Sequence, residues 1–267
     1  MERSNIFLAQ PEAPAPGLRL AVKDLSSTPR AAAKDVARLP GMGADDLAFA
    51  LALADDADAI TLARFRAADL RVETKPDLTP VSEADRLVER TLRERIGRER
   101  PGEAVLGEED GGDPSGWIVD PIDGTRNYTR GIPIWATLIA FRDRVGVVSA
   151  PALGRRWWAV RGAGAFADGE PIRVSAIDRL EDATLLFALD RPVPERAFAA
   201  WHVRGLGDFW AHMLVAEGAA EVAVDAPALA IWDTAAVAVI VEEAGGRFDG
   251  RVSSNGHFDE ETVSVLR

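Results

Sequence analysis

Apolar residues recur at helical spacing in two segments of the N-terminal half of the chain. The first segment begins at Asp45 or Asp46, either of which can cap a helix. Its apolar positions lie near one helical face: Leu47, Leu51, Ala54, Ala57 and Ile60. A second helix is predicted from Ser82 to about Gly97, because Ser82-Glu-Ala-Asp85 matches a capping box. Its apolar positions again share one face: Val88, Leu92 and Ile96.

Short apolar runs bounded by turn residues predict strands. Two of them, Leu70 to Thr74 and Thr79 to Val81, flank the turn at Lys75-Pro-Asp-Leu78. Further strands are predicted at Trp117 to Val119, Trp135 to Phe141, Val145 to Ala150, Trp157 to Val160 and Val222 to Val224. Two more helices are predicted, at Phe209 to Ala216 and Thr234 to Ala244. Because helices and strands interleave without a strict βαβ rhythm, we expect a layered α/β or α+β fold.

Residues 1 to 43 differ from the rest of the chain, since Pro11, Pro14 and Pro16 crowd together without a sustained apolar period. We predict a mobile extension there and a single domain over residues 44 to 267. The apolar run Ala235 to Val241 is far shorter than the roughly 18 residues that a membrane span needs. The start of the chain also lacks the apolar core of a secretory signal. We therefore expect a cytoplasmic protein without membrane attachment.

The composition excludes several classes of site. Lys and Arg number 31 against 43 Asp and Glu, and the resulting net charge of −12 disfavours binding to nucleic acid. The chain has no cysteine, which rules out disulfides, thiolate nucleophiles, zinc-thiolate sites and iron-sulfur ligation. The three histidines form no H-E-x-x-H motif, which argues against a histidine-built zinc centre.

The segment that follows the strand at Trp117 carries the most informative chemistry. Asp120 and Asp123 lie three residues apart around a proline that fixes the backbone, so the two carboxylates can converge. Gly124 permits a close approach to a ligand, and the amides of Gly124 and Thr125 can bind an anion at a helix start. A divalent cation would be needed, because carboxylates repel a phosphate. The alternative is an ordinary turn, which Asp, Pro and Gly also favour.

Three further acidic residues are candidates for the same site. Glu108 lies in Gly107-Glu-Glu-Asp110, Asp233 precedes an alanine-rich helix, and Asp85 belongs to the capping box. Taken singly, each has a structural explanation: a solvated acidic run, a helix N-cap and a capping residue, respectively. Together they support one another.

These segments, in their order along residues 45 to 267, resemble the inositol monophosphatase family. The resemblance rests on Lys75-Pro-Asp-Leu-Thr-Pro-Val-Ser-Glu-Ala-Asp85, Gly107-Glu-Glu109, Asp120-Pro-Ile-Asp-Gly-Thr125 with Asn127, and Trp232-Asp233. It implies a layered αβαβα sandwich of the inositol monophosphatase and fructose-1,6-bisphosphatase type. It also implies a magnesium-dependent phosphomonoesterase.

The resemblance assigns metal ligands residue by residue. Glu108, Asp120 and the carbonyl of Ile122 would hold one Mg²⁺, and Asp120, Asp123 and Asp233 would hold a second. Four carboxylates and a phosphate dianion carry about −6, so two ions leave about −2 and a third would bring neutrality. Oxygen-only ligands select a hard cation, Mg²⁺ first, with Mn²⁺ as a substitute.

The resemblance also assigns the remaining catalytic roles. Thr125, oriented by Asp85, would position or deprotonate the attacking water near Glu108. Lys75 would lie close to the metal ions and the phosphate. Gly124, Thr125 and Asp233 are expected to contact the phosphate or the substrate.

A further set of segments is more similar to the histidinol-phosphate phosphatases within this family. They are Lys75-Pro-Asp-Leu-Thr-Pro80, Arg130-Gly-Ile-Pro-Ile-Trp-Ala136, Val147-Val-Ser-Ala-Pro-Ala-Leu153, Arg156-Trp-Trp158, and Gly207-Asp208-Phe followed by Leu214-Val-Ala-Glu-Gly218. The implied reaction converts histidinol phosphate to histidinol and phosphate, a step of histidine biosynthesis.

Specificity arguments from the residues point the same way. Many inositol phosphatases place a glutamate seven residues before the Trp-Asp aspartate, where this chain has Ala226 with Asp225 one step out of register. Histidinol phosphate carries an ammonium and an imidazole, which a buried Asp208 beside aromatic surface would complement. Alternatively, Asp208 caps the helix that follows it. Arg204 would bind substrate or pair with Asp208.

Other functions are compatible with the same residues. One is an inositol-1-phosphatase or another small-molecule phosphatase of the same family, and another is a noncatalytic relative that binds metal or phosphate. Haloacid-dehalogenase phosphatases fit poorly, because their two aspartates are two residues apart and Asp120 and Asp123 are three apart. A small-molecule phosphate ester is the expected partner, and the family resemblance also implies a homodimer.

Overall fold

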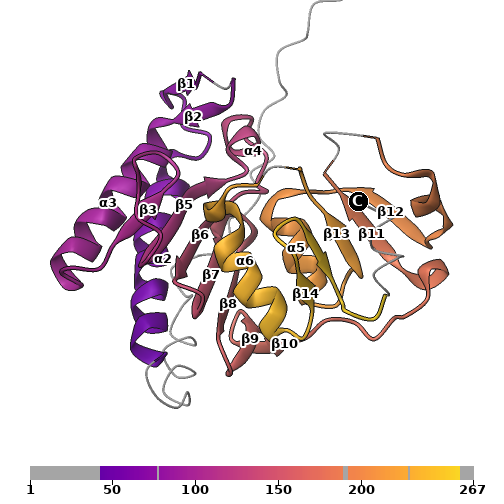
Figure 1. The fold of residues 1–267 in the computed structure, drawn as a ribbon. Coiled ribbons are helices and arrows are strands. Elements are labelled where there is room, and N and C mark those ends of the chain that lie inside the picture. The colour runs from indigo at the N-terminus through magenta and orange to yellow at the C-terminus, as the bar shows by residue number, and fades with distance from the viewer. Residues whose placement is uncertain (1–42, 77, 189–191, 228, 259–267) are drawn as a thin grey trace, which may run out of the picture.

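The computed structural model describes residues 43–76, 78–188, 192–227 and 229–258 (Figure 1). The predicted extension at residues 1 to 43 lies, apart from Gly43, outside the described residues. Two sheets and their helices make up the described part of the chain. Helix α6 (Ile231–Glu243) lies between the two sheets (Figure 1). This is the layered mixture of helices and strands that the sequence predicts.

The larger sheet has eight strands among the described residues, in the order β10-β9-β8-β7-β6-β5-β3-β4. Their bounds are β3 (Val105–Gly107), β4 (Gly111–Gly112), β5 (Trp117–Asp123), β6 (Ala136–Phe141), β7 (Val145–Ala150), β8 (Arg155–Val160), β9 (Gly164–Ala167) and β10 (Glu170–Ile172). Only the β3–β5 pair within this sheet is parallel. This pairing places the end of β3, and with it Glu108, beside the acidic segment of β5.

Helices cover both faces of the larger sheet. Along β6, Leu138 and Ala140 share a core with α6 and α5 (Asp208–Ala216), whereas Ile139 and Phe141 share a core with the helices on the opposite face. Those opposite helices are α2 (Ala44–Arg64) and α3 (Glu83–Glu99). The alternation follows from the two-residue period of a strand.

A second, smaller sheet lies on the other side of α5. It has the order β12-β11-β13-β15-β14 among the described strands. The bounds are β11 (Thr184–Phe187), β12 (His202–Gly205), β13 (Val222–Val224), β14 (Arg247–Phe248) and β15 (Val252–Ser254). Leu186 and Ala223 of this sheet pack against Ala211 and Val215 of α5. Its outer face carries the short 3-10 helix Glu195–Ala199, so the described residues contain the five predicted layers.

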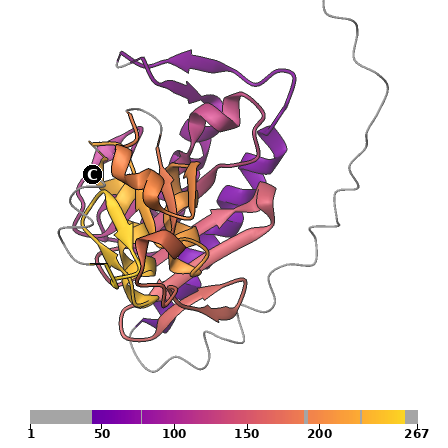
Figure 2. The ribbon, with the colours of Figure 1, turned by 90° about the vertical axis from the view of Figure 1, so that its right-hand side faces the viewer.

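Smaller elements complete the described chain. The antiparallel hairpin of β1 (Val72–Thr74) and β2 (Pro80–Ser82) projects from one end of the molecule (Figure 2), and α4 (Thr125–Thr129) follows β5. Two further 3-10 helices span Pro151–Leu153 and Leu180–Asp182. None of the described helices has both the length and the apolar content that a membrane crossing requires.

The predicted starts of two helices are wrong by one to three residues, and one of these errors changes the position assigned to Asp233. Helix α2 begins at Ala44 with Gly43 at the N-cap, so neither Asp45 nor Asp46 caps it. Helix α6 begins at Ile231 and not at Thr234, which moves Asp233 from the N-cap into the first turn. The capping box of α3 is confirmed: the Ser82 hydroxyl accepts from Ala84 N, and Asp85 accepts from Ser82 N.

Candidate active site

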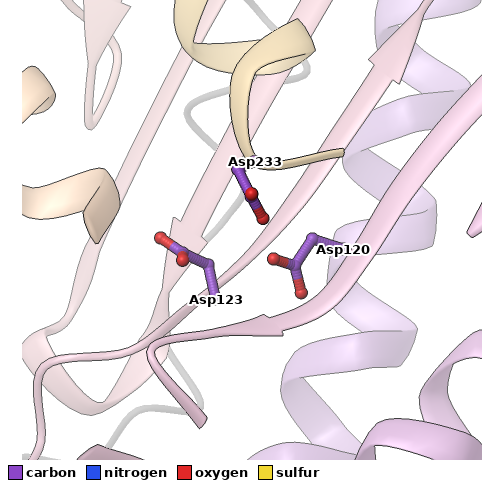
Figure 3. Close-up of side chains that lie close together, drawn as sticks. All are labelled: Asp120, Asp123 and Asp233. Atoms are coloured by element: carbon purple, nitrogen blue, oxygen red, sulfur yellow. The ribbon is translucent and has the colours of Figure 1, made fainter. Parts of the chain in front are cut away.

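Three carboxylates meet at one end of the larger sheet. Asp120 and Asp123 come from β5, and Asp233 comes from the first turn of α6. Each offers an oxygen atom, and these oxygens all lie within 4.8 Å of one another. Figure 3 shows the three side chains close together, with Asp233 reaching down from α6 toward Asp120 and Asp123. Residues separated by more than a hundred positions in the chain are thus brought together.

Local hydrogen bonds explain why the carboxylates of β5 converge. The register between β5 and β6 shifts between Asp120 and Asp123, which breaks the usual alternation of side chains. Asp120 Oδ1 accepts the amide of Ile122 at 2.9 Å. Asp123 Oδ2 accepts the amide of Phe209, in the first turn of α5, at 2.6 Å. The predicted strand therefore runs four residues further than expected, to Asp123, with an irregularity at the acidic residues.

Asp233 is held by the start of its own helix. Its Oδ2 accepts the amide of Ala230 at 2.7 Å, which is the carboxylate half of a capping box. The same carboxylate also contributes an oxygen that lies within 4.8 Å of oxygens of Asp120 and Asp123. The structural explanation for Asp233 and its place in the acidic group are therefore compatible.

The carboxylates repel one another, and burial together with this repulsion raises their pKa values. Burial, followed by repulsion from Glu108 and neighbouring aspartates, raises the pKa of Asp120 well above its ordinary value. Burial and the charges of Asp208 and Asp233 do the same for Asp123. The pKa of Asp233 rises to about 6, mainly because of burial and despite its bond from Ala230. A bound cation would offset this repulsion, because a positive charge among the oxygens favours the ionised form of every carboxylate in the group.

The donor set fits a hard divalent cation. Every side-chain donor of the group is a carboxylate oxygen, and the sequence contains no thiolate that would favour a softer metal. The structure thus brings Asp120, Asp123 and Asp233 together as the resemblance implies.

Glu108 lies next to this group, just after β3. Its charge contributes to the raised pKa values of Asp120 and Asp233. Lys75 Nζ donates to Glu108 Oε1 at 2.8 Å and to Glu109 Oε1 at 2.7 Å. Burial alone would lower the pKa of Lys75, but the bonds and charges of the two glutamates outweigh it and raise that pKa. Lys75 therefore stays an ammonium and brings a fixed positive charge to the site.

Thr125 lies between the acidic segment and helix α3. Its hydroxyl is within hydrogen-bond reach of the carbonyl of Ile122, at 2.8 Å, and of Asp85 Oδ1, at 3.3 Å. Asp85 is fully buried and also accepts from the amide and hydroxyl of Ser82, at 2.8 and 2.6 Å. Burial raises the pKa of Asp85 to about 6, although the bonds from Ser82 oppose the rise. The Thr125 hydroxyl has one proton, so it donates to only one of the Ile122 and Asp85 oxygens at a time.

Gly124 makes the turn from β5 into α4. Its φ of 83° is left-handed, and a Cβ there would lie 3.0 Å from the carbonyl oxygen of Ile134. Both facts favour glycine. Helix α4 has five residues, so its capacity to bind an anion through the amides of Gly124 and Thr125 stays a prediction.

Two expectations about Asp208 are wrong. It is exposed to solvent, not buried, because it begins α5 at the edge of the site. The N-cap of α5 is Gly207, so Asp208 does not cap the helix; it is the first helical residue, with a φ of 55°. Its carboxylate nevertheless faces the acidic group, since its charge is the largest neighbouring contribution to the raised pKa of Asp123. An ideal Cβ on Gly124 would lie 3.6 Å from Asp208 Oδ2.

Arg204 lies on β12 and is exposed. Its guanidinium donates to the carbonyl of Val203 at 3.0 Å, and no ion pair with Asp208 is formed among the described residues. The predicted pairing of Arg204 with Asp208 is therefore not seen. Its expected contact with substrate stays a prediction.

Two buried acidic residues near the site were not predicted to matter. Glu89 is buried on α3 and accepts the amides of Glu109 and Asp110. Asp225 follows β13 and accepts from His212 Nε2 at 3.2 Å; burial would raise its pKa, but the contact with His212 outweighs this and lowers it. For Glu89 a sequence signal existed, because it lies one helical turn after Asp85 and on the buried side of α3.

The chain is similar to known proteins over most of its length. The profile of the inositol monophosphatase family matches residues 44–262. A histidinol-phosphatase of Mycobacterium tuberculosis is 48% identical over 250 residues, covering 81% of this chain and 96% of that protein. A histidinol-phosphatase of Streptomyces coelicolor is 45% identical over 250 residues, covering 80% and 94%.

A solved structure agrees with these sequence matches. The IMPase of Thermotoga maritima is 30% identical, with a TM-score of 0.74, and the match covers 83% of this chain and 96% of that one. The layered fold, the acidic group and the family profile therefore point to one conclusion. The chain belongs to the inositol monophosphatase family.

Proposed function

We propose that the protein hydrolyses histidinol phosphate to histidinol and phosphate with Mg²⁺ as its cofactor. The observation that carries the phosphatase assignment is the meeting of Asp120, Asp123 and Asp233 within 4.8 Å, with Glu108 and Lys75 beside them. The substrate is supported by the identity, 48% and 45%, with two proteins named histidinol-phosphatase.

The residues that would hold the cations are Glu108, Asp120, Asp123 and Asp233, with the carbonyl of Ile122. Two or three Mg²⁺, or Mn²⁺ in their place, would neutralise the carboxylates, attract the phosphate and lower the pKa of the attacking water. Lys75 adds a permanent positive charge that interacts with Glu108. The chain itself therefore supplies the anionic half of the site and one fixed cation.

Thr125 is proposed to orient the attacking water. Its hydroxyl proton can go to the carbonyl of Ile122 or to Asp85, both within reach. When the proton points at either acceptor, the oxygen lone pairs of Thr125 are free to accept a hydrogen bond from water. Asp85 fixes this orientation because burial and two bonds from Ser82 hold it in one place.

Substrate recognition is proposed to combine phosphate and amine contacts. Gly124 and Thr125 would contact the phosphate at the turn into α4, beside Asp233. Asp208 would pair with the ammonium of the substrate, because its exposed carboxylate lies beside Gly124 and has no lysine or arginine partner at ion-pair distance among the described residues. Arg204 would contribute from the neighbouring strand β12.

Three broader statements belong to the same proposal. Residues 44 to 267 would form one catalytic domain, supported by a site that joins β1–β2, α3, β5 and α6. The protein would be cytoplasmic.

The protein would also be a homodimer. This proposal is supported by the exposed aromatic side chains of Phe198 and Trp201, 68% and 72% accessible, which a partner chain would cover. Sedimentation velocity tests the dimer: a species with twice the mass of one chain is expected, and a monomer at micromolar concentration would contradict it.

The experiment that tests the function is phosphate release from a panel of esters, with Mg²⁺ and with chelator. The panel comprises histidinol phosphate, inositol 1-phosphate, fructose 1,6-bisphosphate and 3′-phosphoadenosine 5′-phosphate. We expect kcat/KM for histidinol phosphate to exceed the others by at least about 100-fold, or ~2.7 kcal/mol. A preference for inositol 1-phosphate would replace the substrate and keep the mechanism, whereas no release from any ester would favour a noncatalytic relative.

A further inference from the structure

Helix α3 presents three charged residues to the site, each one turn after the last: Asp85, Glu89 and Arg93. Residues four apart lie on the same side of a helix, so the three form one row. Asp85 reaches Thr125, as described above. The other two residues reach the loop between β3 and β4, which carries Glu108.

Glu89 uses both of its carboxylate oxygens within the protein. Oε2 accepts the amide of Glu109 at 2.7 Å, and Oε1 accepts the amide of Asp110 at 3.0 Å. Arg93 donates to Oε1 through Nε at 2.9 Å. The Glu89 side chain is 1% exposed, so it is shielded from solvent. Its bonds therefore act on the backbone immediately after Glu108.

Arg93 ties the ends of the same loop. Its guanidinium donates to the carbonyl of Val105, at 3.3 Å, and to the carbonyl of Gly111. Val105 begins β3 and Gly111 begins β4, so one side chain spans the base of the loop. Gly107 completes the arrangement, because a Cβ there would lie only 2.1 Å from Glu89 Oε1. The loop fits against Glu89 only because residue 107 lacks a side chain.

We infer that Glu89, held by Arg93, is a positioning residue that fixes Glu108 for cation binding. A buried carboxylate without partners is strongly destabilising, so the loop amides of Glu109 and Asp110 are held firmly in place against it. Glu108 lies directly before these amides, so the backbone from which its side chain projects is fixed by the same bonds. The row on α3 thus sets two parts of the site at once: Thr125 through Asp85, and Glu108 through Glu89. This inference rests on the proposed cation-dependent function.

The test is Mn²⁺ binding, measured by calorimetry on the full chain without substrate. Glu89→Gln keeps the size of the side chain but loses the charge and one acceptor oxygen. Replacing residues that orient metal ligands commonly lowers metal affinity by about 10- to 100-fold, and we expect a loss in this range. With saturating Mn²⁺, the KM for histidinol phosphate should change less than about threefold, because Glu89 does not touch the substrate region.

Asp56→Asn is the matched control. Asp56 lies on α2 and forms a 2.6 Å ion pair with Arg95. Arg95 lies on α3, as Glu89 does, but this ion pair does not involve the loop that carries Glu108. Its loss should leave Mn²⁺ affinity within about twofold. If Glu89→Gln does not fold, Arg93→Gln replaces it, because Arg93 is 25% exposed on its side chain and its loss frees the loop while keeping Glu89.

The outcomes separate this inference from the proposed function. A folded Glu89→Gln or Arg93→Gln protein with the wild-type Mn²⁺ affinity would overturn the positioning role and leave the function intact. The same loss of affinity in Asp56→Asn would also overturn it, since the effect would then be general. If the wild-type chain bound no divalent cation, the proposed function and the inference would fall together.

Discussion

Asp120 is the residue at which stability and function oppose each other most directly. Burial and neighbouring charges raise its pKa, so the folded metal-free protein binds a proton there more tightly than the unfolded chain does. The resulting stability is fully present below the unfolded pKa, near 3.8, and is lost as the pH rises through the folded value. Above that value the ionised group destabilises the folded protein, and a bound cation removes this destabilisation.

Asp120→Asn should separate these two effects. Without metal at pH 8 we expect the variant to be more stable than wild type by about 1 to 3 kcal/mol, the common range for a single substitution. The difference should vanish near pH 4. With Mg²⁺ at about 100 times its Kd, wild type should gain ~2.7 kcal/mol and the variant far less, and turnover should be abolished. Urea unfolding with and without Mg²⁺ checks this; a variant less stable than wild type at pH 8 without metal would refute the electrostatic account.

Thr125→Ala tests the assignment of the water-positioning hydroxyl. Loss of a group that orients or deprotonates the nucleophile typically costs about 10²- to 10⁴-fold in rate, so kcat should fall at least about 100-fold. Mg²⁺ affinity should fall far less than kcat, because the Thr125 hydroxyl contacts only one of the proposed cation ligands, the carbonyl of Ile122, and none of the metal-binding carboxylates. Thr129→Ala, on the same short helix, is the control and should retain activity. Parallel losses of rate and metal affinity would count against the role.

Asp208→Asn tests substrate specificity. An ion pair to the substrate ammonium is worth about 1.4 kcal/mol or more, so kcat/KM for histidinol phosphate should fall about tenfold. Hydrolysis of β-glycerophosphate, which has no ammonium, should change less than about twofold. The exposed Asp113, which accepts the amide of Ser115, provides the control substitution Asp113→Asn. Equal losses with both substrates would exclude a role in recognising the amine.

For single residues, the sequence predicted which side chains form the site better than it predicted their exposure and their hydrogen bonds. Asp120, Asp123 and Asp233 could be grouped because their motifs occur together. The exposure of Asp208 could not be predicted, because it depends on a left-handed residue at the start of α5. The hydrogen bond from the amide of Phe209 to Asp123 Oδ2 could not be predicted either, because it joins residues 86 positions apart in the chain.

At the scale of elements, two glycines should respond in opposite ways to alanine. A Cβ on Gly146 of β7 would lie 2.5 Å from the carbonyl oxygen of Ala236 in α6, so the helix would have to move. We expect Gly146→Ala to cost about 1 to 3 kcal/mol, as overpacking does, and to weaken Mg²⁺ binding because α6 carries Asp233. Gly97 lies in α3 with no atom within 4 Å of its added Cβ, so Gly97→Ala should stabilise by about 0.4 to 1 kcal/mol. Denaturant unfolding measures both, and a stabilised Gly146→Ala would refute the close contact.

The elements that the sequence predicted are the long, regularly patterned ones. Helix α3 was predicted from its first residue, because a capping box and a buried stripe of Val88, Leu92 and Ile96 agree. The predicted strands did not include β3, β4, β9 to β12, β14 and β15, each of which has two to four residues. Runs this short contain too few positions for a two-residue period to emerge, and pairing with neighbours decides them.

At the scale of the whole molecule, the site depends on two layers meeting. Helix α6 packs on the larger sheet through Val237 and Ile240, and its first turn brings Asp233 to the end of β5 (Figure 1). Helix α5 adds the amide of Phe209 from between the two sheets. The carboxylates are thus held by elements with large apolar contacts, which can bear their mutual repulsion. The sequence could predict these layers only through the family resemblance, because their packing joins distant segments.

The proposed function depends on carboxylates from distant segments that jointly bind divalent cations. Anomalous diffraction from a crystal soaked in Mn²⁺ tests it most directly, since Mn²⁺ stands in for Mg²⁺ and can be located unambiguously. We expect at least one strong peak within about 2.0 to 2.6 Å of oxygens from Asp120, Asp123 and Asp233, with another beside Glu108. Mn²⁺ absent from this group in an otherwise well-ordered soaked crystal, or carboxylates turned away from one another, would contradict it.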